Sequence, residues 1–253
     1  MMSYQQRWRY LLLWLWVLGS LALVLSLGPL AQNQAYHEFA DQRTLWGLPH
    51  ALNILSNLPL LVVGCAGLLF VRRDRTEATR AAWQALFAGL VLVSAGSAYY
   101  HWQPSNETLL WDRLPMTIGF MGLFIALLGE YLRPGLARLL VPALLTGLAS
   151  VFYWYWFDDL RPYIWVQFMP LLSIPLLMML FDSRYSHGRW LLVALAWYGL
   201  AKLAEVYDLA IYQATDALIS GHTLKHLLAA ASGYSLLWML QIRTPVRAPT
   251  EVR

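Results

Sequence analysis

The chain has 253 residues, of which 59% are hydrophobic and only 13% are charged, and its formal net charge is +4. A soluble domain has about 25% charged residues, so this composition excludes a disordered chain, a basic nucleic-acid-binding domain and an ordinary cytosolic enzyme. The single cysteine, Cys65, lies in an apolar run, which excludes internal disulfides and Cys-ligated metal sites and leaves His and carboxylate side chains as the candidate metal ligands.

Eight apolar segments follow one another along the chain, each close to the length of about 20 residues that a membrane-spanning helix requires. They are predicted at residues 11–31, 51–71, 81–102, 114–132, 139–157, 163–181, 190–212 and 222–241. Gly and Pro residues inside them, such as Gly64, Pro142 and Pro170, suit lipid-embedded helices better than strands. The predicted fold class is therefore all-α: a polytopic membrane bundle with a seven-helix core and one additional helix before it.

The first segment is predicted to be a retained anchor within residues 1–35. A signal peptide is the alternative, because Arg7 and Arg9 precede the apolar run and Ala31 lies in a region of small residues. The run is longer than a usual signal core, which favours the anchor. Residues 36–242 are predicted to form the seven-helix membrane domain, and residues 243–253 a polar, basic tail.

Arginines divide unevenly between the two sides of the predicted bundle. One side holds Arg7, Arg9, Arg72, Arg73, Arg75, Arg80, Arg133, Arg138, Arg184, Arg189, Arg243, Arg247 and Arg253, and the other holds Arg43, Arg113 and Arg161. Cytoplasmic loops retain Lys and Arg, so both termini are predicted to be cytoplasmic. This orientation requires an even number of spans and agrees with eight.

Three histidines are predicted to collect near the opposite, outer face. His101 ends the third predicted span, and His222 and His226 begin the eighth. Because His222 and His226 are four residues apart, they lie on one helix face and can hold one ion. Three His ligands with an open fourth position are typical of a catalytic zinc site. The alternative is that these are separate polar residues at helix ends, where water and lipid headgroups satisfy them.

Two further polar residues are expected at the same depth. Ser97 lies one turn below His101 on the same face, and Asp112 is expected near the start of the fourth span. Asp112 would then be placed to accept a hydrogen bond from a metal-bound water. Ionisable groups inside a membrane are costly and usually functional, so the shared depth of these groups favours a metal site over separate residues.

Lys202, Glu205 and Asp208 are spaced three apart in the seventh predicted span, and this spacing places them on one stripe. One interpretation is a buried ion-paired network that holds helices together. Another is a set of groups that orients the metal-binding imidazoles. A third is the proton relay of a transporter, which predicts a polar path that continues to the cytoplasmic face.

These motifs together resemble the alkaline ceramidase family, part of a superfamily of membrane hydrolases that includes the adiponectin and progestin receptors. The resemblance rests on S-x-x-x-H at 97–101, the Asp at 112 and H-x-x-x-H at 222–226, and it extends over residues 39–241. The Ser56-Asn57-Leu58 stretch and residues 111–116 and 220–226 look particularly like bacterial members. All of these motifs occur in the family's order and spacing.

The resemblance implies that His101, His222 and His226 bind Zn²⁺ and that Asp112 and Ser97 are catalytic groups beside the bound water. It also implies an amide-lipid substrate. Residues 39–50 lack the acidic cluster by which animal ceramidases bind calcium, and His50 stands where those proteins have a glutamate. Calcium dependence is therefore not expected, although Glu38 and Asp41 lie nearby.

The predicted function is a zinc-dependent intramembrane amidase that hydrolyses the N-acyl bond of a ceramide-like lipid to a fatty acid and an amino lipid. Asp112 would serve as general base, and zinc with Ser97 would stabilise the oxyanion. The expected partner is a lipid of the cell membrane and not a nucleic acid, with the metal site near the outer face. The alternative is a receptor-like or structural protein whose zinc only ties helices together. It would fill the fourth zinc position with Asp112 and would have no acyl-sized cavity.

Overall fold

The structure is a computed structural model that describes residues 4–73 and 78–246. Within these ranges it contains helices and loops and no β-strand, which confirms the predicted all-α class. The α-helices are α1 (Tyr4–Ser26), α2 (Ala51–Leu55), α3 (Leu58–Arg73), α4 (Arg80–Trp102), α5 (Asn106–Tyr131), α6 (Leu140–Phe157), α7 (Arg161–Leu180), α8 (Arg189–Val206), α9 (Asp208–Ala214) and α10 (Gly221–Ile242). Two short 3₁₀ helices are η1 (Gln34–His37) and η2 (Pro134–Leu139). Arg75, and residues 247–253 of the predicted tail, lie outside the described residues.

Six helical stretches in the described ranges are long and apolar enough to cross a membrane, and the bent pair of α8 and α9 would make a seventh. They correspond to the first seven predicted spans. α10 occupies the position of the eighth, but its first two turns carry His222, Lys225 and His226, and it is not among these stretches. The structure therefore supports a polytopic membrane protein, while eight spans remain a prediction.

The seventh predicted span is two helices rather than one. α8 and α9 meet at Tyr207 with an angle of 82° between them. At this corner the start of α10 packs so closely that a Cβ on Gly221 would lie 2.1 Å from the carbonyl oxygen of Ala204 and 2.7 Å from the Cα of Asp208. Lys202, Glu205 and Asp208 thus do not form one continuous helical stripe, because Asp208 is the first residue of α9.

The fourth predicted span also begins earlier than expected. α5 starts at Asn106 because Ser105 and Thr108 form a capping box, in which each side chain accepts a hydrogen bond from the other's backbone N–H. Asp112 therefore lies inside α5 and is buried. α4 and α5 cross so tightly here that a Cβ on Gly96 would lie 2.1 Å from the carbonyl oxygen of Trp111. This close crossing brings the end of α4 beside Asp112.

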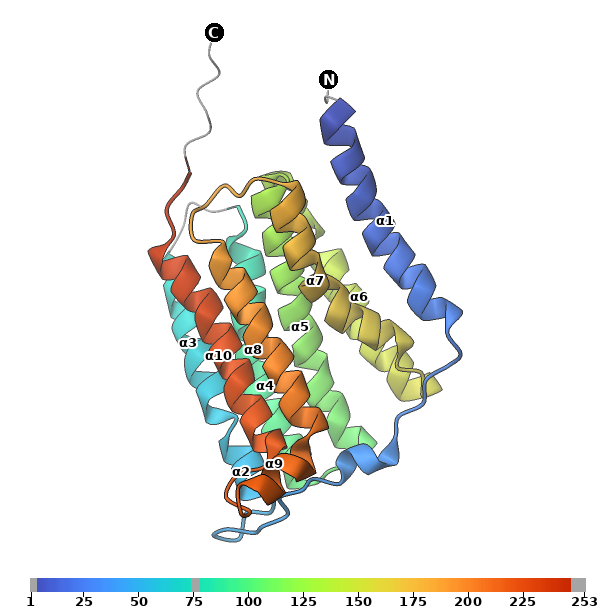
Figure 1. Cartoon of the computed structure of the whole chain (residues 1–253), viewed down its shortest axis with the longest axis vertical. Helices are drawn as coiled ribbons and strands as arrows, with labels where there is room; N and C mark the ends of the chain where they lie inside the picture. Colours follow the sequence, from blue (N-terminus) through green and yellow to red (C-terminus); the bar gives the residue numbers. More distant parts are fainter. Residues whose placement is uncertain (1–3, 74–77, 247–253) are drawn as a thin grey trace.

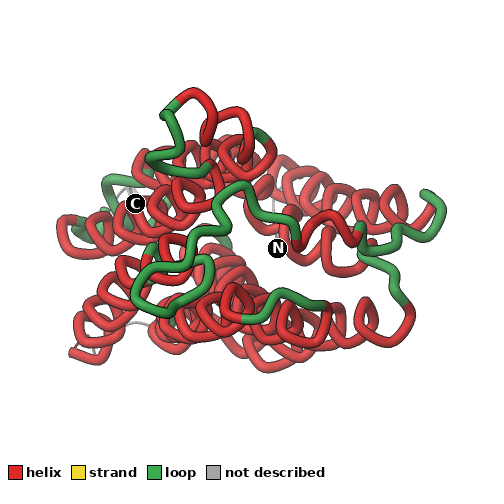
Figure 2. The backbone as a smooth tube through the Cα atoms, turned by 90° about the horizontal axis from the view of Figure 1, so that it is seen from below, coloured by secondary structure: helices red, strands yellow, loops and turns green. Residues whose placement is uncertain are grey.

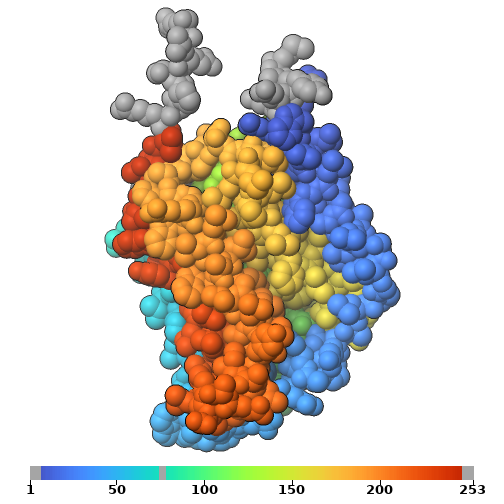
Figure 3. All heavy atoms as spheres, viewed as in Figure 1, coloured from blue at the N-terminus to red at the C-terminus, as the bar shows by residue number. Residues whose placement is uncertain are grey.

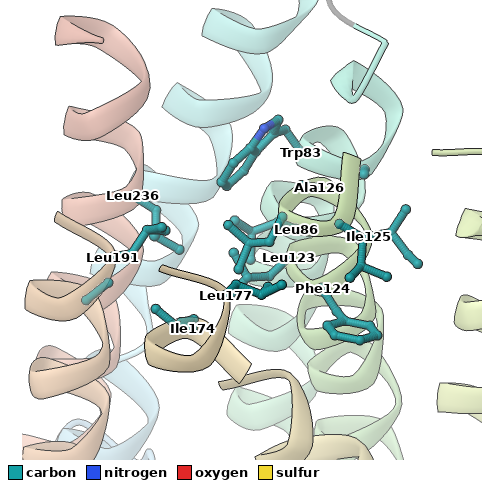
Figure 4. Close-up of a cluster of buried hydrophobic side chains, with 14 of the residues drawn as sticks. Trp83, Leu86, Leu123, Phe124, Ile125, Ala126, Ile174, Leu177, Leu191 and Leu236 are labelled. Carbon is teal, nitrogen blue, oxygen red and sulfur yellow. The ribbon is translucent and has the colours of Figure 1, made fainter. Parts of the chain in front are cut away.

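α5 is the central helix of the bundle and is buried along most of its length, whereas α1 is exposed along nearly all of its own (Figure 1). Figure 4 shows the core around α5, where apolar side chains of α4, α7, α8 and α10 meet. They include Trp83, Leu86, Leu123, Phe124, Ile174, Leu177, Leu191 and Leu236. α1 lies along the flank of the molecule in Figure 3 and packs on α7, where Trp16 Nε1 donates to Ser173 Oγ at 2.9 Å.

The two ends of the bundle differ in what they carry. The start of α1, the end of α10, η2 and the loop between α7 and α8 lie at one end, the terminal end, whereas α2, α9 and the start of α10 lie at the other (Figure 1). Seen from that second end, loops cross the bundle (Figure 2). Many of the arginines that we assigned to one side flank connections at the terminal end. That this end faces the cytoplasm remains a prediction.

Candidate metal centre

Three buried imidazoles converge at the end of the bundle that lies opposite the terminal end. His101 comes from the last turn of α4, and His222 and His226 come from the first two turns of α10. Nε2 of His101 lies 3.2 Å from Nε2 of His222 and 3.3 Å from Nε2 of His226. One ligand atom from each of the three residues lies within 4.8 Å of the other two. The structure thus brings together the three histidines that the sequence selected.

These separations fit a shared metal ion. Imidazole nitrogens bind zinc at about 2.0–2.1 Å, so two ligands of a tetrahedral ion lie about 3.3 Å apart. A neutral imidazole nitrogen has either one N–H or one lone pair, so hydrogen bonding among the three rings does not satisfy every Nε2. A divalent cation would satisfy all three at once.

Ser56 contacts one of these imidazoles. It lies in the break between α2 and α3, where its hydroxyl donates to the carbonyl oxygen of Asn53 at 3.0 Å. The same Oγ lies 2.7 Å from Nδ1 of His226, where it can accept from the imidazole. With its proton on Nδ1, His226 would present the Nε2 lone pair to the centre, as a metal ligand must.

The sequence alone assigns no role to Ser56, which occurs there only within the Ser56-Asn57-Leu58 stretch that resembles the family. The signal that marks it is a polar Ser-Asn pair within an apolar segment, because such a pair interrupts the helix and frees a backbone carbonyl. Asn57 Nδ2 also donates to the Asn53 carbonyl, at 2.9 Å, so both residues of the pair stabilise this break.

The segment between η1 and α2 covers the centre at the end of the bundle. The ring of Phe39 packs edge-on against His101 and His222, with centroid distances of 4.7 and 4.6 Å. Phe39 is only 3% exposed. His50 places Nδ1 2.9 Å from the backbone carbonyl oxygen of His101. This segment thus supports the ligand helix and separates the imidazoles from that end of the molecule.

Asp208 fixes the start of α10 rather than an imidazole ring. Its Oδ1 accepts from the backbone N–H of His222 at 2.7 Å, and its Oδ2 accepts from that of Ala40 at 2.9 Å. The Ser220 side chain caps the same helix by accepting from Thr223 N at 3.0 Å. Two carboxylate bonds and one cap therefore hold the backbone that carries His222.

Asp112 and Ser97 face a cavity of about 350 Å³ that His226 also lines. Among the described residues, the group that could hold a metal ion consists of the three histidines and does not include Asp112. Met116, Ile164 and Phe168 contribute an apolar wall. The arrangement places a carboxylate, a hydroxyl and one ligand of the centre around a space that can hold an amide group and part of an acyl chain.

A second charged group lines the same cavity. Lys202 forms an ion pair with Glu205, and Lys225 Nζ lies 3.0 Å from Glu205 Oε1. Tyr36 donates its hydroxyl to the same oxygen at 2.9 Å, and burial raises the pKa of this phenol, which keeps it protonated. Lys202 and Glu205 therefore belong to an ion-paired network with Lys225 and Tyr36, two residues to which the sequence analysis gave no role.

Comparison with known proteins gives one match. The model of the family described as Ceramidase matches residues 49–248, which is more than half of the chain. The matched range includes the three histidines, Ser97 and Asp112, and it leaves out α1 and the segment that carries Phe39. No match is found among curated proteins.

Proposed function

Because the chain belongs to the ceramidase family, and so to hydrolases that act on amides, we propose that it is a zinc-dependent amidase that releases a fatty acid from an N-acyl lipid. The observation that carries this proposal is the cavity in which His226 lies beside Asp112 and Ser97. A site that hydrolyses an amide needs an electrophile, a proton acceptor and a donor for the oxyanion. A metal ion held at His226 would supply the first function, and Asp112 and Ser97 would supply the other two.

The three histidines would hold the ion through Nε2, and Ser56 would keep His226 in the required tautomer. Bound Zn²⁺ would supply a Lewis acid that polarises the carbonyl and makes a water molecule acidic at neutral pH. The ligands come from α4 and α10, two packed helices, which favours a fixed geometry for the acyl carbonyl.

Asp112 is the proton carrier in this proposal. Its carboxylate would accept the proton of the attacking water and then deliver it to the nitrogen of the leaving amine. The Ser97 hydroxyl, which lines the same cavity, would donate a hydrogen bond to the developing oxyanion. Both residues are almost fully buried, so bulk water does not compete for these hydrogen bonds.

The cavity walls favour a lipid substrate. The apolar side of the cavity is formed by α5 and α7, which also contribute side chains to the hydrophobic core of the bundle. An acyl chain on this wall would place its carbonyl near the polar end of the cavity. The Arg-rich end would face the cytoplasm, and the centre would lie near the outer face of the cell membrane.

The alternative is a receptor-like or structural protein whose zinc only ties helices together. That role calls for a closed coordination shell, with Asp112 as the fourth ligand and no cavity. In the described part of the chain, Asp112 stands outside the histidine group and faces a cavity instead. This difference favours the enzyme.

The proposal can be tested on the full-length protein purified in detergent, by measuring zinc content and fatty acid release from ceramide and other N-acyl lipids. We expect Asp112→Asn to keep its zinc and to lose about 10²–10⁴-fold in rate, the usual contribution of a general base. Asp182→Asn, an exposed aspartate in the loop between α7 and α8, is the matched control and should match wild type. Full zinc occupancy without hydrolysis of any N-acyl lipid would favour the structural role.

A further inference from the structure

Arg113 is a buried guanidinium beside the candidate centre. It follows Asp112 in α5, lines the same cavity and is only 5% exposed. In the described part of the chain no carboxylate forms an ion pair with it. A buried charge within a membrane bundle is costly unless it is paired, so its retention there indicates a function.

The surroundings of Arg113 fix its orientation without neutralising its charge. Nη2 donates to Oε1 of Gln32 at 2.7 Å. The guanidinium carbon lies 4.1 Å from the ring centroid of Trp154 and 4.9 Å from that of Tyr163. Aromatic faces and an amide oxygen stabilise a cation, but they carry no formal negative charge.

One nitrogen of this guanidinium is left for a ligand. Nη1 of Arg113 is buried and has no hydrogen-bond partner among the described residues. Buried polar atoms are rarely left unsatisfied, and those that are need an explanation such as a bound group. Arg113 lines the cavity, and Nη2 and the ring faces already hold the guanidinium plane, so Nη1 is the donor that remains for a bound group.

The charge of the cavity specifies the kind of acceptor. Its cationic residues are Arg113, Lys202 and Lys225, and its carboxylates are Asp112 and Glu205. Glu205 is already paired with both lysines, so the lining carries excess positive charge before any metal ion is counted. An arginine binds carboxylate and phosphate oxygens more strongly than neutral acceptors.

We propose that Arg113 binds an anionic group on the amine side of the substrate. The preferred substrates are then N-acyl lipids whose amine part carries a carboxylate or a phosphate, rather than neutral ceramides. The inference rests on the proposed amidase function. With the acyl chain on the apolar wall and the amide at the histidine centre, the amine substituent is the part of the substrate left for Arg113.

The test compares three substrates of the zinc-loaded full-length protein in detergent: N-oleoylglycine, its neutral amide N-oleoylglycinamide, and N-oleoylethanolamine phosphate. We expect kcat/KM for at least one anionic substrate to exceed that for N-oleoylglycinamide by about tenfold or more, the size expected for a charge-assisted hydrogen bond. The better anionic substrate identifies the carboxylate or the phosphate as the natural group. Equal values for all three would overturn the proposal.

Arg113→Gln should lower the ratio of anionic to neutral kcat/KM about tenfold, mainly through KM. Arg43→Gln is the matched control, because Arg43 pairs with Asp41 and does not line the cavity, and it should keep the wild-type ratio. An unchanged ratio in Arg113→Gln contradicts the assignment. The wild-type preference is measured independently, so it still tests the proposal if the variant does not fold.

Measurements of substrate binding test this inference independently of the proposed function. Asp112→Asn should bind N-oleoylglycine or the phosphate about tenfold more tightly than N-oleoylglycinamide, and the additional replacement of Arg113 by Gln should remove this preference. A preference that depends on Arg113, in a protein that hydrolyses none of the amides, would confirm the anion site and reject the amidase. Hydrolysis without any such preference would confirm the amidase and reject the anion site.

Discussion

Charged residues are buried at both ends of the bundle, but the two ends satisfy them differently. At the terminal end, Glu130 accepts from Trp83 Nε1 at 2.6 Å and from Arg243 Nη1 at 2.9 Å on each carboxylate oxygen. At the other end, Nε2 atoms of three histidines face one another, and Arg113 Nη1 has no partner among the described residues. The first end is complete as it stands, whereas the second leaves donors and acceptors for a ligand.

This contrast separates two kinds of buried polar group. Both would be read from the sequence as ionisable residues in an apolar chain, which usually mark function. Only the hydrogen-bond and ion-pair partners distinguish the two kinds. A buried carboxylate whose oxygens all have partners stabilises helix packing, whereas buried groups that lack partners can bind substrate or metal. The following substitutions test the contrast from one end and then the other.

The largest effect is expected at the histidines. His222→Ala combined with His226→Ala removes two of the three candidate ligands, so the protein should lose its metal and all detectable amide hydrolysis. Elemental analysis of the purified protein measures the metal directly. His187→Ala, an exposed histidine between α7 and α8, should keep both. Full metal occupancy in the double variant would show that these imidazoles are not the ligands.

Glu130→Gln should affect stability instead of chemistry. It removes the charge of the carboxylate that pairs with Arg243, and breaking such a buried pair costs about 3–5 kcal/mol. We expect a lower unfolding midpoint in detergent but unchanged metal content below that midpoint. Glu107→Gln is the control on the same helix, since Glu107 is exposed. Loss of metal at a temperature where Glu130→Gln remains folded would mean that the two ends are not independent.

A smaller effect is expected for Ser56→Ala, which removes the proposed acceptor of the His226 Nδ1 proton. Loss of such a partner usually lowers metal affinity about 10–100-fold. Competition with a chelator measures this affinity. Ser150→Ala removes a buried hydroxyl with the same local bond, to the carbonyl of Gly147 three residues earlier, and it should leave the affinity unchanged. Equal affinities in the two variants would remove Ser56 from the metal centre.

The smallest effect concerns the turn between α6 and α7. The Arg161 guanidinium beside Asp159 holds the pKa of that carboxyl below its usual value, and the carboxylate also accepts from Leu30 N. Its stabilisation is therefore present above the ordinary Asp pKa and is lost as the pH falls through the lowered folded-state pKa. We expect Asp159→Asn to be less stable than wild type by under about 1 kcal/mol at neutral pH. The difference between their unfolding midpoints should shrink below about pH 4. A difference that persists at low pH would contradict the assignment.

Local patterns were enough to find most of the helices and the histidine cluster. The four-residue spacing of His222 and His226 places them on one face in any helix, and the apolar runs delimit most of the spans. The predicted topology then placed His101 at the same depth, at the end of the third span. These features depend on short stretches of sequence, so they can be read without tertiary contacts.

Other features depended on contacts between distant segments. The early start of α5 requires the Ser105–Thr108 capping box, and the corner between α8 and α9 accompanies the close approach of Gly221. Arg113 was counted only as one of few arginines on its side of the bundle. The role proposed for Arg113 depends on its contacts with Gln32 and Trp154, which are far from it in sequence. It also depends on Nη1, which has no hydrogen-bond partner among the described residues.

The position of Phe39 has a consequence for the kinetics of the proposed reaction. Its ring covers two of the imidazoles at the end of the bundle, so a lipid would reach the centre through the cavity, from within the bilayer. Substrate supply is then two-dimensional. Turnover would follow the mole fraction of substrate among the surrounding lipids rather than its amount per volume of buffer, and diluting the membrane with inert lipid would slow the reaction at constant total substrate.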